Sequence, residues 1–296
     1  MGGEPMTTVL YDVPGPKAIA RNRVIAVATV LLAAAVIGFV VYRFAITGQF
    51  DARKWELFTY PQVWERIGSA IVSTLSAFAL GAVLSLALGF ALAIGRLSEH
   101  AWVRVPCAVF TELFRAVPLL ILMMIIYYGL PPLGVQGITP YAAVVAGLTL
   151  YNGSVLAEVF RAGILSLPPG QAEAGYAIGM RKSGVMSIIL IPQAVRAMLP
   201  VIIAQLVVIL KDTALGFLIT YQELLFTAKF LSSQQSFDFP VIPVTIVVSI
   251  IYIGLCLILS AVAKLVELRI RRGSRRAVPA DEEPPTQTEA MATVRR

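Results

Sequence analysis

Six long apolar runs divide this chain of 296 residues, and they constrain its fold more than any other feature. A helix that crosses the hydrocarbon core of a bilayer needs about 20 mostly apolar residues. None of the runs alternates polar and apolar residues as the strands of a membrane β-barrel do. We therefore predict an all-α integral membrane protein, a helical bundle of about six transmembrane helices. The runs lie at 24–46, 67–94, 113–130, 141–160, 199–220 and 241–262.

The composition supports a membrane location for these runs. Of the residues, 58% are hydrophobic and only 14% are charged, which is too few charges to cover a water-soluble surface. The first run follows three basic residues, as the core of a signal peptide does. It is too long for such a core and no clear A-x-A cleavage site follows it, so we predict an uncleaved N-terminal transmembrane helix.

The basic residues predict which side of the membrane each loop faces, because cytoplasmic loops carry an excess of Lys and Arg. With a cytoplasmic N-terminus, 18 of the 24 Lys and Arg lie inside, five lie outside, and Lys211 lies within a span. We therefore predict that both termini are cytoplasmic. The net charge of +7 then reflects this asymmetry and needs no nucleic-acid partner. The basic residues left outside are Arg43, Arg53, Lys54, Arg66 and Lys229.

The chain carries few residues suited to a catalytic or metal centre. It has two cysteines, Cys107 and Cys256, and one histidine, His100. Two scattered thiols and one imidazole do not make a metal site, and the sequence has no G-x4-G-K-[ST] phosphate-binding loop. We predict no enzyme activity and no cofactor in this chain.

A polar stretch between the fourth and fifth runs is the most specific motif. Pro168, Pro169 and Gly170 end the preceding helix and open a new one, because proline fits the first helical turn. A short helix with small side chains and one carboxylate can lie in a groove of a partner protein. The plain alternative is an ordinary helical hairpin between two spans. The motif residues are Glu173, Ala174, Gly175, Gly179 as a left-handed cap, Ile189 and Pro192.

These residues resemble the E-A-A-x3-G-x9-I-x-L-P loop by which permease subunits of bacterial ABC importers dock on their ATPase subunits. Gly175 replaces the third alanine, and Ile191 replaces the leucine. Three further stretches are similar to permeases for polar amino acids. The added first run and the long tail are most similar to the glutamate permeases of actinobacteria. The three stretches are E-L-F-R-A-V-P-L-L at 112–120, A-E-V-F-R-A-G-I at 157–164 and L-K-D-T-A-L at 210–215.

The resemblance implies the five-helix core of a type I ABC importer permease plus one N-terminal helix. It also implies a second, related permease subunit, two ATPase subunits that hold ATP and Mg, and an extracytoplasmic amino-acid-binding protein, all at the cell membrane. The basic part of the tail is expected to contact anionic membrane lipids. The expected organisation is a cytoplasmic tail 1–23, an extra helix 24–46, a permease domain 67–267 with a coupling loop 165–195, and a tail 268–296 that is basic and then disordered from about Gly273.

Four polar residues are candidates for a substrate cavity. A charge inside a span costs about 2.5 to 3.5 kcal/mol, so it should face the bundle interior or water. Lys211 and Asp212 lie about 100° apart on a helix and can flank one cavity. Lys211 can meet a substrate carboxylate and Asp212 an ammonium, while Asn152 and Thr213 orient either group. Alternatively, Lys211 and Asp212 cross-link helices through buried hydrogen bonds.

Four charged residues at predicted cytoplasmic span ends are assigned to a gate or scaffold, because snorkelling or ion pairs between helices account for them. They are Glu112, Arg115, Glu158 and Arg161. The segment 221–240, with Phe226, Phe230 and Phe237, is expected outside the membrane, either as an interfacial helix or as a contact for a substrate-delivering protein.

Together these features predict the transmembrane permease subunit of an ATP-driven importer for a polar amino acid, working by alternating access. L-glutamate is the first expectation, and glutamine or a basic amino acid is the alternative. An alternative of another class is an ion-coupled secondary carrier, for which we find no internal repeat. A membrane-embedded enzyme would need clustered catalytic groups that the spans lack.

Overall fold

The structure, a computed structural model, describes residues 15–275, and this part of the chain is helical without strands. Five of its helical segments are long and apolar enough to cross a membrane, or six if one bent pair counts as a span. This confirms the predicted bundle of about six helices. The long helices are α1 (Pro16–Ile46), α3 (Pro61–Arg96), α6 (Pro140–Leu165), α9 (Ile191–Asp212) and α11 (Val241–Arg275).

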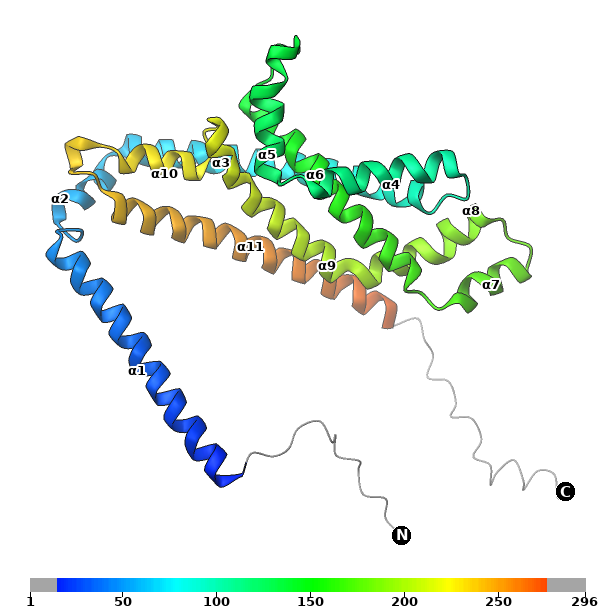
Figure 1. Cartoon of the computed structure of the whole chain (residues 1–296), viewed down its shortest axis with the longest axis horizontal. Coiled ribbons are helices and arrows are strands. Elements are labelled where there is room, and N and C mark those ends of the chain that lie inside the picture. Colours follow the sequence, from blue (N-terminus) through cyan, green and yellow to red (C-terminus); the bar gives the residue numbers. More distant parts are fainter. Residues whose placement is uncertain (1–14, 276–296) are drawn as a thin grey trace.

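The third predicted span, 113–130, is not one continuous helix. Helix α4 (Ala101–Ala116) ends within this run. After a bend of 100°, the chain continues as α5 (Leu119–Met124) and then as the π-helical turn η2 (Ile125–Gly129). The cause is Pro118, which lacks an N–H and pushes the residue before it out of the helical conformation. Val117 is accordingly extended, with φ −86° and ψ 125°. Figure 1 shows α5 leaving the bundle at a steep angle to α4.

Helices α3 and α6 pack closely in the centre of the bundle, and glycines permit the contact. A Cβ on Gly89 of α3 would lie 2.8 Å from the carbonyl oxygen of Gly153 on α6. Small residues at helix crossings allow backbones to approach in this way. The buried side chains of Ala77, Val144 and Leu148 belong to the cluster that fills this region.

One end of the bundle is closed by short elements: α2 (Ala52–Trp55), η1 (Glu56–Thr59), α10 (Leu224–Ser232) and η6 (Gln235–Phe237). Leu57, Leu224 and Leu231 share one buried cluster with residues of α3 and α11. Helix α10 therefore packs against α3 and α11 on its buried side, while Leu225 and Phe230 are exposed. Its location at the membrane interface stays a prediction. The phenylalanines of this segment carried no signal that α10 folds back against α3 and α11.

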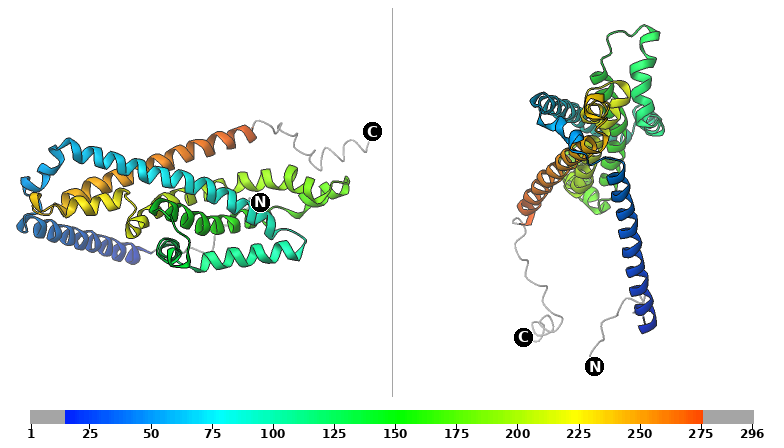
Figure 2. Two further views of the ribbon diagram at one scale, coloured as in Figure 1. Left: turned by 90° about the horizontal axis from the view of Figure 1, so that it is seen from above. Right: turned by 90° about the vertical axis from the view of Figure 1, so that its left-hand side faces the viewer.

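Helix α1 stands apart from the bundle, as Figures 1 and 2 show. None of its residues is buried, so its apolar surface faces outward all round. It begins at Pro16, within the predicted tail 1–23, and the rest of that tail lies outside the described residues. Helix α11 likewise continues to Arg275, past the predicted end at 262. Residues 273–275, at the approximate start of the predicted disorder, belong to this helix, and the remainder of that prediction lies outside the described part.

The motif that joins the fourth and fifth spans folds as a helical hairpin at the other end of the bundle, far from α2 (Figure 1). Its first arm is α7 (Pro169–Ala177). Its second arm is α8 (Lys182–Gly184), followed by the π-helical turn η4 (Val185–Leu190), which leads directly into α9. After α9 the chain tightens into the 3-10 helix η5 (Thr213–Ile219). The second arm of the hairpin is thus continuous with the fifth span.

Candidate functional site

Helix α7 has both of the ends that the sequence predicts. Pro169 occupies its first turn. At the other end Gly179 has φ +81°, a conformation that glycine adopts without steric cost. The N–H of Gly179 donates to the carbonyl of Tyr176 at 2.9 Å, and the N–H of Met180 donates to the carbonyl of Gly175 at 3.1 Å. This pair of bonds is a Schellman motif, so the predicted cap at Gly179 is confirmed.

The motif residues divide between an inner and an outer face of the hairpin. Gly175 is buried against the η4 turn, where Ile189 packs beside it. Glu173 and Ala174 are exposed, as is Pro192 at the start of α9. Large apolar side chains share the outer face, with Ile178 78% exposed and Tyr176 47% exposed. An exposed apolar surface next to one carboxylate is typical of a protein contact site.

The packing of α7 explains why the motif has Gly175 where the related loops have alanine. A Cβ at this position would lie 2.9 Å from Cγ2 of Val185 and 3.0 Å from Cδ1 of Ile189. We expect Gly175→Ala to destabilise the hairpin by about 1–3 kcal/mol, the usual cost of overpacking. Faster proteolysis between 165 and 195 would show this. The control is Gly170→Ala, since nothing lies within 4 Å of a Cβ there. Equal cleavage of the two variants would contradict the packing.

Two contacts hold the hairpin against its surroundings. The Lys182 ammonium lies 2.8 Å from a carboxylate oxygen of Glu99 and donates to the carbonyl of Leu97 at 3.3 Å. This ammonium holds the pKa of the Glu99 carboxyl below its ordinary value. Gln193 donates to Gln171 at 3.3 Å across the base of the hairpin. The hairpin therefore touches the α3–α4 turn as well as α9. No local pattern in the sequence indicates the contact with Glu99.

Three of the four candidate cavity residues are tied into a polar cross-link between helices. Asn152 of α6 donates to Asp212 at 3.3 Å and accepts from Gln205 of α9 at 2.7 Å. Thr213 donates to the carbonyl of Leu210 at 2.7 Å and lies 3.1 Å from the Tyr252 hydroxyl of α11. Asn152 and Thr213 are completely buried. Sequence reasoning missed Gln205 and Tyr252, which are single polar residues in apolar runs.

Lys211 differs from its neighbour Asp212. Its side chain is exposed, and no carboxylate in the described part of the chain pairs with it. The buried cross-link that was the alternative interpretation thus applies to Asp212 but not to Lys211. The difference follows from helix geometry, since adjacent side chains point about 100° apart. Lys211 is the member of the candidate set that a ligand or a second subunit can reach.

The four residues assigned to a gate or scaffold come together in one ionic cluster, joined by Arg96 at the end of α3. Arg96 lies 3.0 Å from Glu158 of α6 and 3.5 Å from Glu112 of α4. Arg161 contacts Glu158 through two of its nitrogens. Arg115 lies 3.5 Å from Glu112. The cluster therefore links α3, α4 and α6 through ion pairs.

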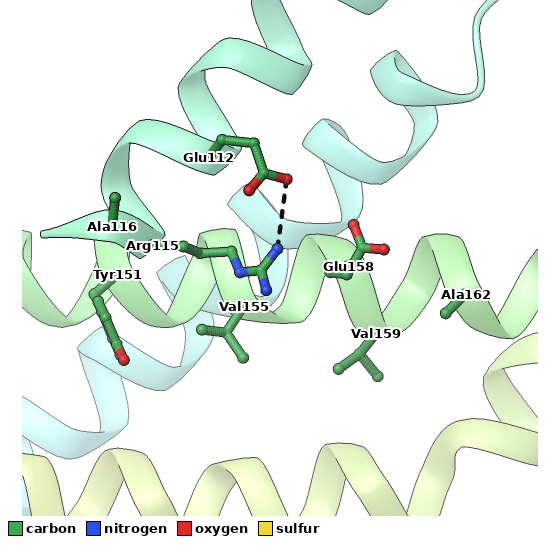
Figure 3. A pocket seen from close by; sticks show the side chains of 8 residues that line it. All are labelled: Glu112, Arg115, Ala116, Tyr151, Val155, Glu158, Val159 and Ala162. Carbon is green, nitrogen blue, oxygen red and sulfur yellow. Dashed lines mark ion pairs between the residues drawn. The ribbon is translucent and has the colours of Figure 1, made fainter.

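A pocket of about 590 Å³ opens beside the cluster, between α4 and α6. Its polar wall is formed by Glu112, Arg115, Glu158 and the phenol of Tyr151. Figure 3 shows these side chains around the pocket, with the ion pair between Arg115 and Glu112 dashed. Small and β-branched side chains of α4 and α6 form the remainder of the wall. Sequence reasoning missed the roles of Arg96 and Tyr151. The partners of Arg96 lie on other helices, and Tyr151 has no hydrogen-bond partner among the described residues.

Comparison with known proteins places this geometry in a family. The family profile described as "Binding-protein-dependent transport system inner membrane component" matches residues 85–272, which is more than half of the chain. The chain belongs to this family. The matched region contains the last third of α3, all elements from α4 to α10 with the α7 hairpin and the ionic cluster, and most of α11. It leaves out α1, α2 and η1, so the family membership rests on the bundle and not on the separate first helix.

Two relatives and one solved structure show the range of this permease family. The glutamate transport system permease protein GluD of Corynebacterium glutamicum is 42% identical over 235 residues, covering 77% of this chain and 84% of its own. The L-cystine transport system permease protein TcyB of Bacillus subtilis is 29% identical over 218 residues, covering 74% and 92%. The crystal structure of an amino acid ABC transporter with histidines has a TM-score of 0.65 at 27% identity, covering 72% of this chain and 98% of that chain. The predicted resemblance to amino acid permeases is therefore confirmed.

Proposed function

We propose that this chain is the transmembrane permease subunit of an ATP-driven ABC importer for a polar amino acid, with L-glutamate as substrate. The observation that carries the proposal is the exposed α7 hairpin, on a chain 42% identical to a glutamate permease. Glutamine and basic amino acids are the alternative substrates. One relative is named for L-cystine, so the same fold serves different amino acids and does not by itself select the substrate.

In this proposal the outer face of α7 seats in a groove of an ATPase subunit. Glu173 offers its carboxylate to a donor of that subunit, while Tyr176 and Ile178 supply apolar contact. When two ATPase subunits close on ATP and Mg, each hairpin moves with them. The movement passes into α9 through the continuous η4 turn, and into the α3–α4 turn through Lys182. The helices then rock and expose a central cavity first to one side and then to the other.

The proposal also covers the assembly around the chain. A second, related permease completes the pathway, and an extracytoplasmic binding protein delivers the amino acid. The excess of basic residues near the α7 end supports a cytoplasmic location for the hairpin and for both termini. The chain itself is not an enzyme in this account, since ATP hydrolysis takes place in the partner ATPase subunits. The complex lies in the cell membrane.

Lys211 provides a test of the candidate cavity. Because its ammonium is exposed and has no carboxylate partner in the described residues, Lys211→Ala should leave assembly intact and weaken transport by about 10- to 100-fold, the value of a lost charged hydrogen bond. Uptake by membrane vesicles and co-purification with the ATPase measure the two effects. Lys229→Ala, which removes the ammonium of another exposed lysine, on α10 and outside the candidate set, is the control. A complex that fails to assemble would assign Lys211 to a subunit contact instead.

Co-purification from native membranes separates this proposal from a secondary carrier. The importer proposal requires an ATPase subunit and a second permease bound to the chain. A chain that transports an amino acid alone, driven by an ion gradient and insensitive to ATP, would be an ion-coupled carrier. No observation on the described residues favours that alternative.

A further inference from the structure

The pocket beside the ionic cluster carries an unbalanced charge. Three guanidinium groups, those of Arg96, Arg115 and Arg161, meet two carboxylates, those of Glu112 and Glu158. With every group ionised, the cluster has one more positive than negative charge. A surplus positive charge of this kind attracts an anion to the pocket.

The surplus belongs to Arg115. Arg161 contacts Glu158 through two nitrogens, and Arg96 is only 13% exposed and contacts both carboxylates. Arg115 is 38% exposed and has one contact, at 3.5 Å, with a Glu112 carboxylate that also faces Arg96. A guanidinium has five N–H donors in a planar fork. Most of the donors of Arg115 are therefore free to bind a ligand.

The remainder of the pocket suits a small amino acid. Its volume of about 590 Å³ exceeds what one amino acid needs, and it opens between α4 and α6. The Tyr151 hydroxyl lines it and has no hydrogen-bond partner among the described residues. Val155 and Val159 form an apolar wall for a hydrocarbon chain. Glu112, 62% exposed, can accept a bond from an ammonium.

We propose that this pocket is a binding site for an anionic amino acid, in which Arg115 binds a carboxylate and Glu112 binds the ammonium. The proposal rests on the proposed function and adds the residues that bind the charged groups of the substrate. A dicarboxylic amino acid, with a net charge of −1, neutralises the cluster. A neutral amino acid leaves the surplus in place, and a basic one increases it. The site therefore favours glutamate and aspartate over glutamine, and glutamine over lysine.

The experiment measures binding of radiolabelled L-glutamate to the complete transporter complex, without its binding protein, in lipid nanodiscs. Arg115→Gln should weaken binding by about 10- to 100-fold, the effect of one charge-assisted contact. Arg115→Lys keeps the charge and should recover part of the affinity. Arg104→Gln is the matched control, since Arg104 lies on the same helix, is exposed and is not part of the pocket. Co-purified ATPase subunits show that each variant is assembled.

Competition and lipid composition complete the test. Aspartate should displace the label, whereas glutamine should do so weakly and lysine not at all. An unchanged affinity in Arg115→Gln, or equal displacement by glutamine, would overturn the proposal. Loss of glutamate binding when phosphatidylglycerol is added to phosphatidylcholine discs, only where Arg115 is present, would assign the pocket to a lipid headgroup and also overturn it. If either of these results is found while ATP-driven transport persists, the pocket proposal fails and the proposed function stands. A complex that contains no ATPase would contradict both the pocket proposal and the proposed function.

Discussion

Glu173→Lys will abolish amino acid uptake while leaving the protein in the membrane. Glu173 is an exposed carboxylate on the outer face of α7, and the buried side of that helix does not involve it. Reversing a charge in a protein contact costs about 2–5 kcal/mol, which weakens docking about 30- to several thousand-fold. Uptake by vesicles and the amount of bound ATPase report the loss of transport and of docking.

The control for this experiment is Glu65→Lys, which makes the same change at an exposed position of α3, near the other end of the bundle. It should retain uptake and bound ATPase. Should Glu173→Lys transport as well as this control, α7 is not the site at which an ATPase acts. A variant missing from the membrane would instead assign Glu173 a role in folding, which its exposure argues against.

Gly89→Ala will produce the largest loss of stability of any single methyl group added to the bundle centre. The new Cβ would lie 2.8 Å from the Gly153 carbonyl oxygen and 2.8 Å from Cβ of Leu156. Neither atom is the end of a flexible side chain, so α3 and α6 must separate. We expect a cost of about 3 kcal/mol or more. For a chain of this size that lowers the midpoint of thermal unfolding by roughly 6–12 °C.

Gly68→Ala is the matched control, because it makes the same change on the same helix where nothing lies within 4 Å of the new atom. Its midpoint should stay the same or rise, since alanine favours the helix. Fluorescence-detected unfolding of the two variants in one detergent measures the difference. Equal midpoints would mean that α3 and α6 are not in backbone contact at Gly89.

The sequence is sufficient to predict features that local signals determine. The α7 hairpin is one of them, because Pro169 and Gly179 fix its helix ends by rules that need no distant partner. The long spans are another, because their length and hydropathy depend on composition alone. The error at the third span also comes from relying on local hydropathy. Pro118 was visible in the sequence, but the apolar pattern on both sides of it concealed a bend of 100°.

The ionic cluster and its pocket could not be predicted, because they depend on the packing of three helices. The sequence analysis singled out Glu112, Arg115, Glu158 and Arg161 as a set, but it did not include Arg96, the residue that joins them. Its partners are on α4 and α6. The sequence likewise places Lys211 and Asp212 side by side, but only the packing of α6 on α9 decides that Asp212 is bonded and Lys211 is exposed.

ATP hydrolysis by the purified complex of this chain with its partner subunits, in lipid and with the binding protein present, tests the central claim most directly. The account predicts that L-glutamate with its binding protein stimulates hydrolysis and that glutamine or arginine, each with its own binding protein, does so much less. Stimulation by a different amino acid alone would contradict the choice of glutamate. The absence of any associated ATPase would contradict the importer itself.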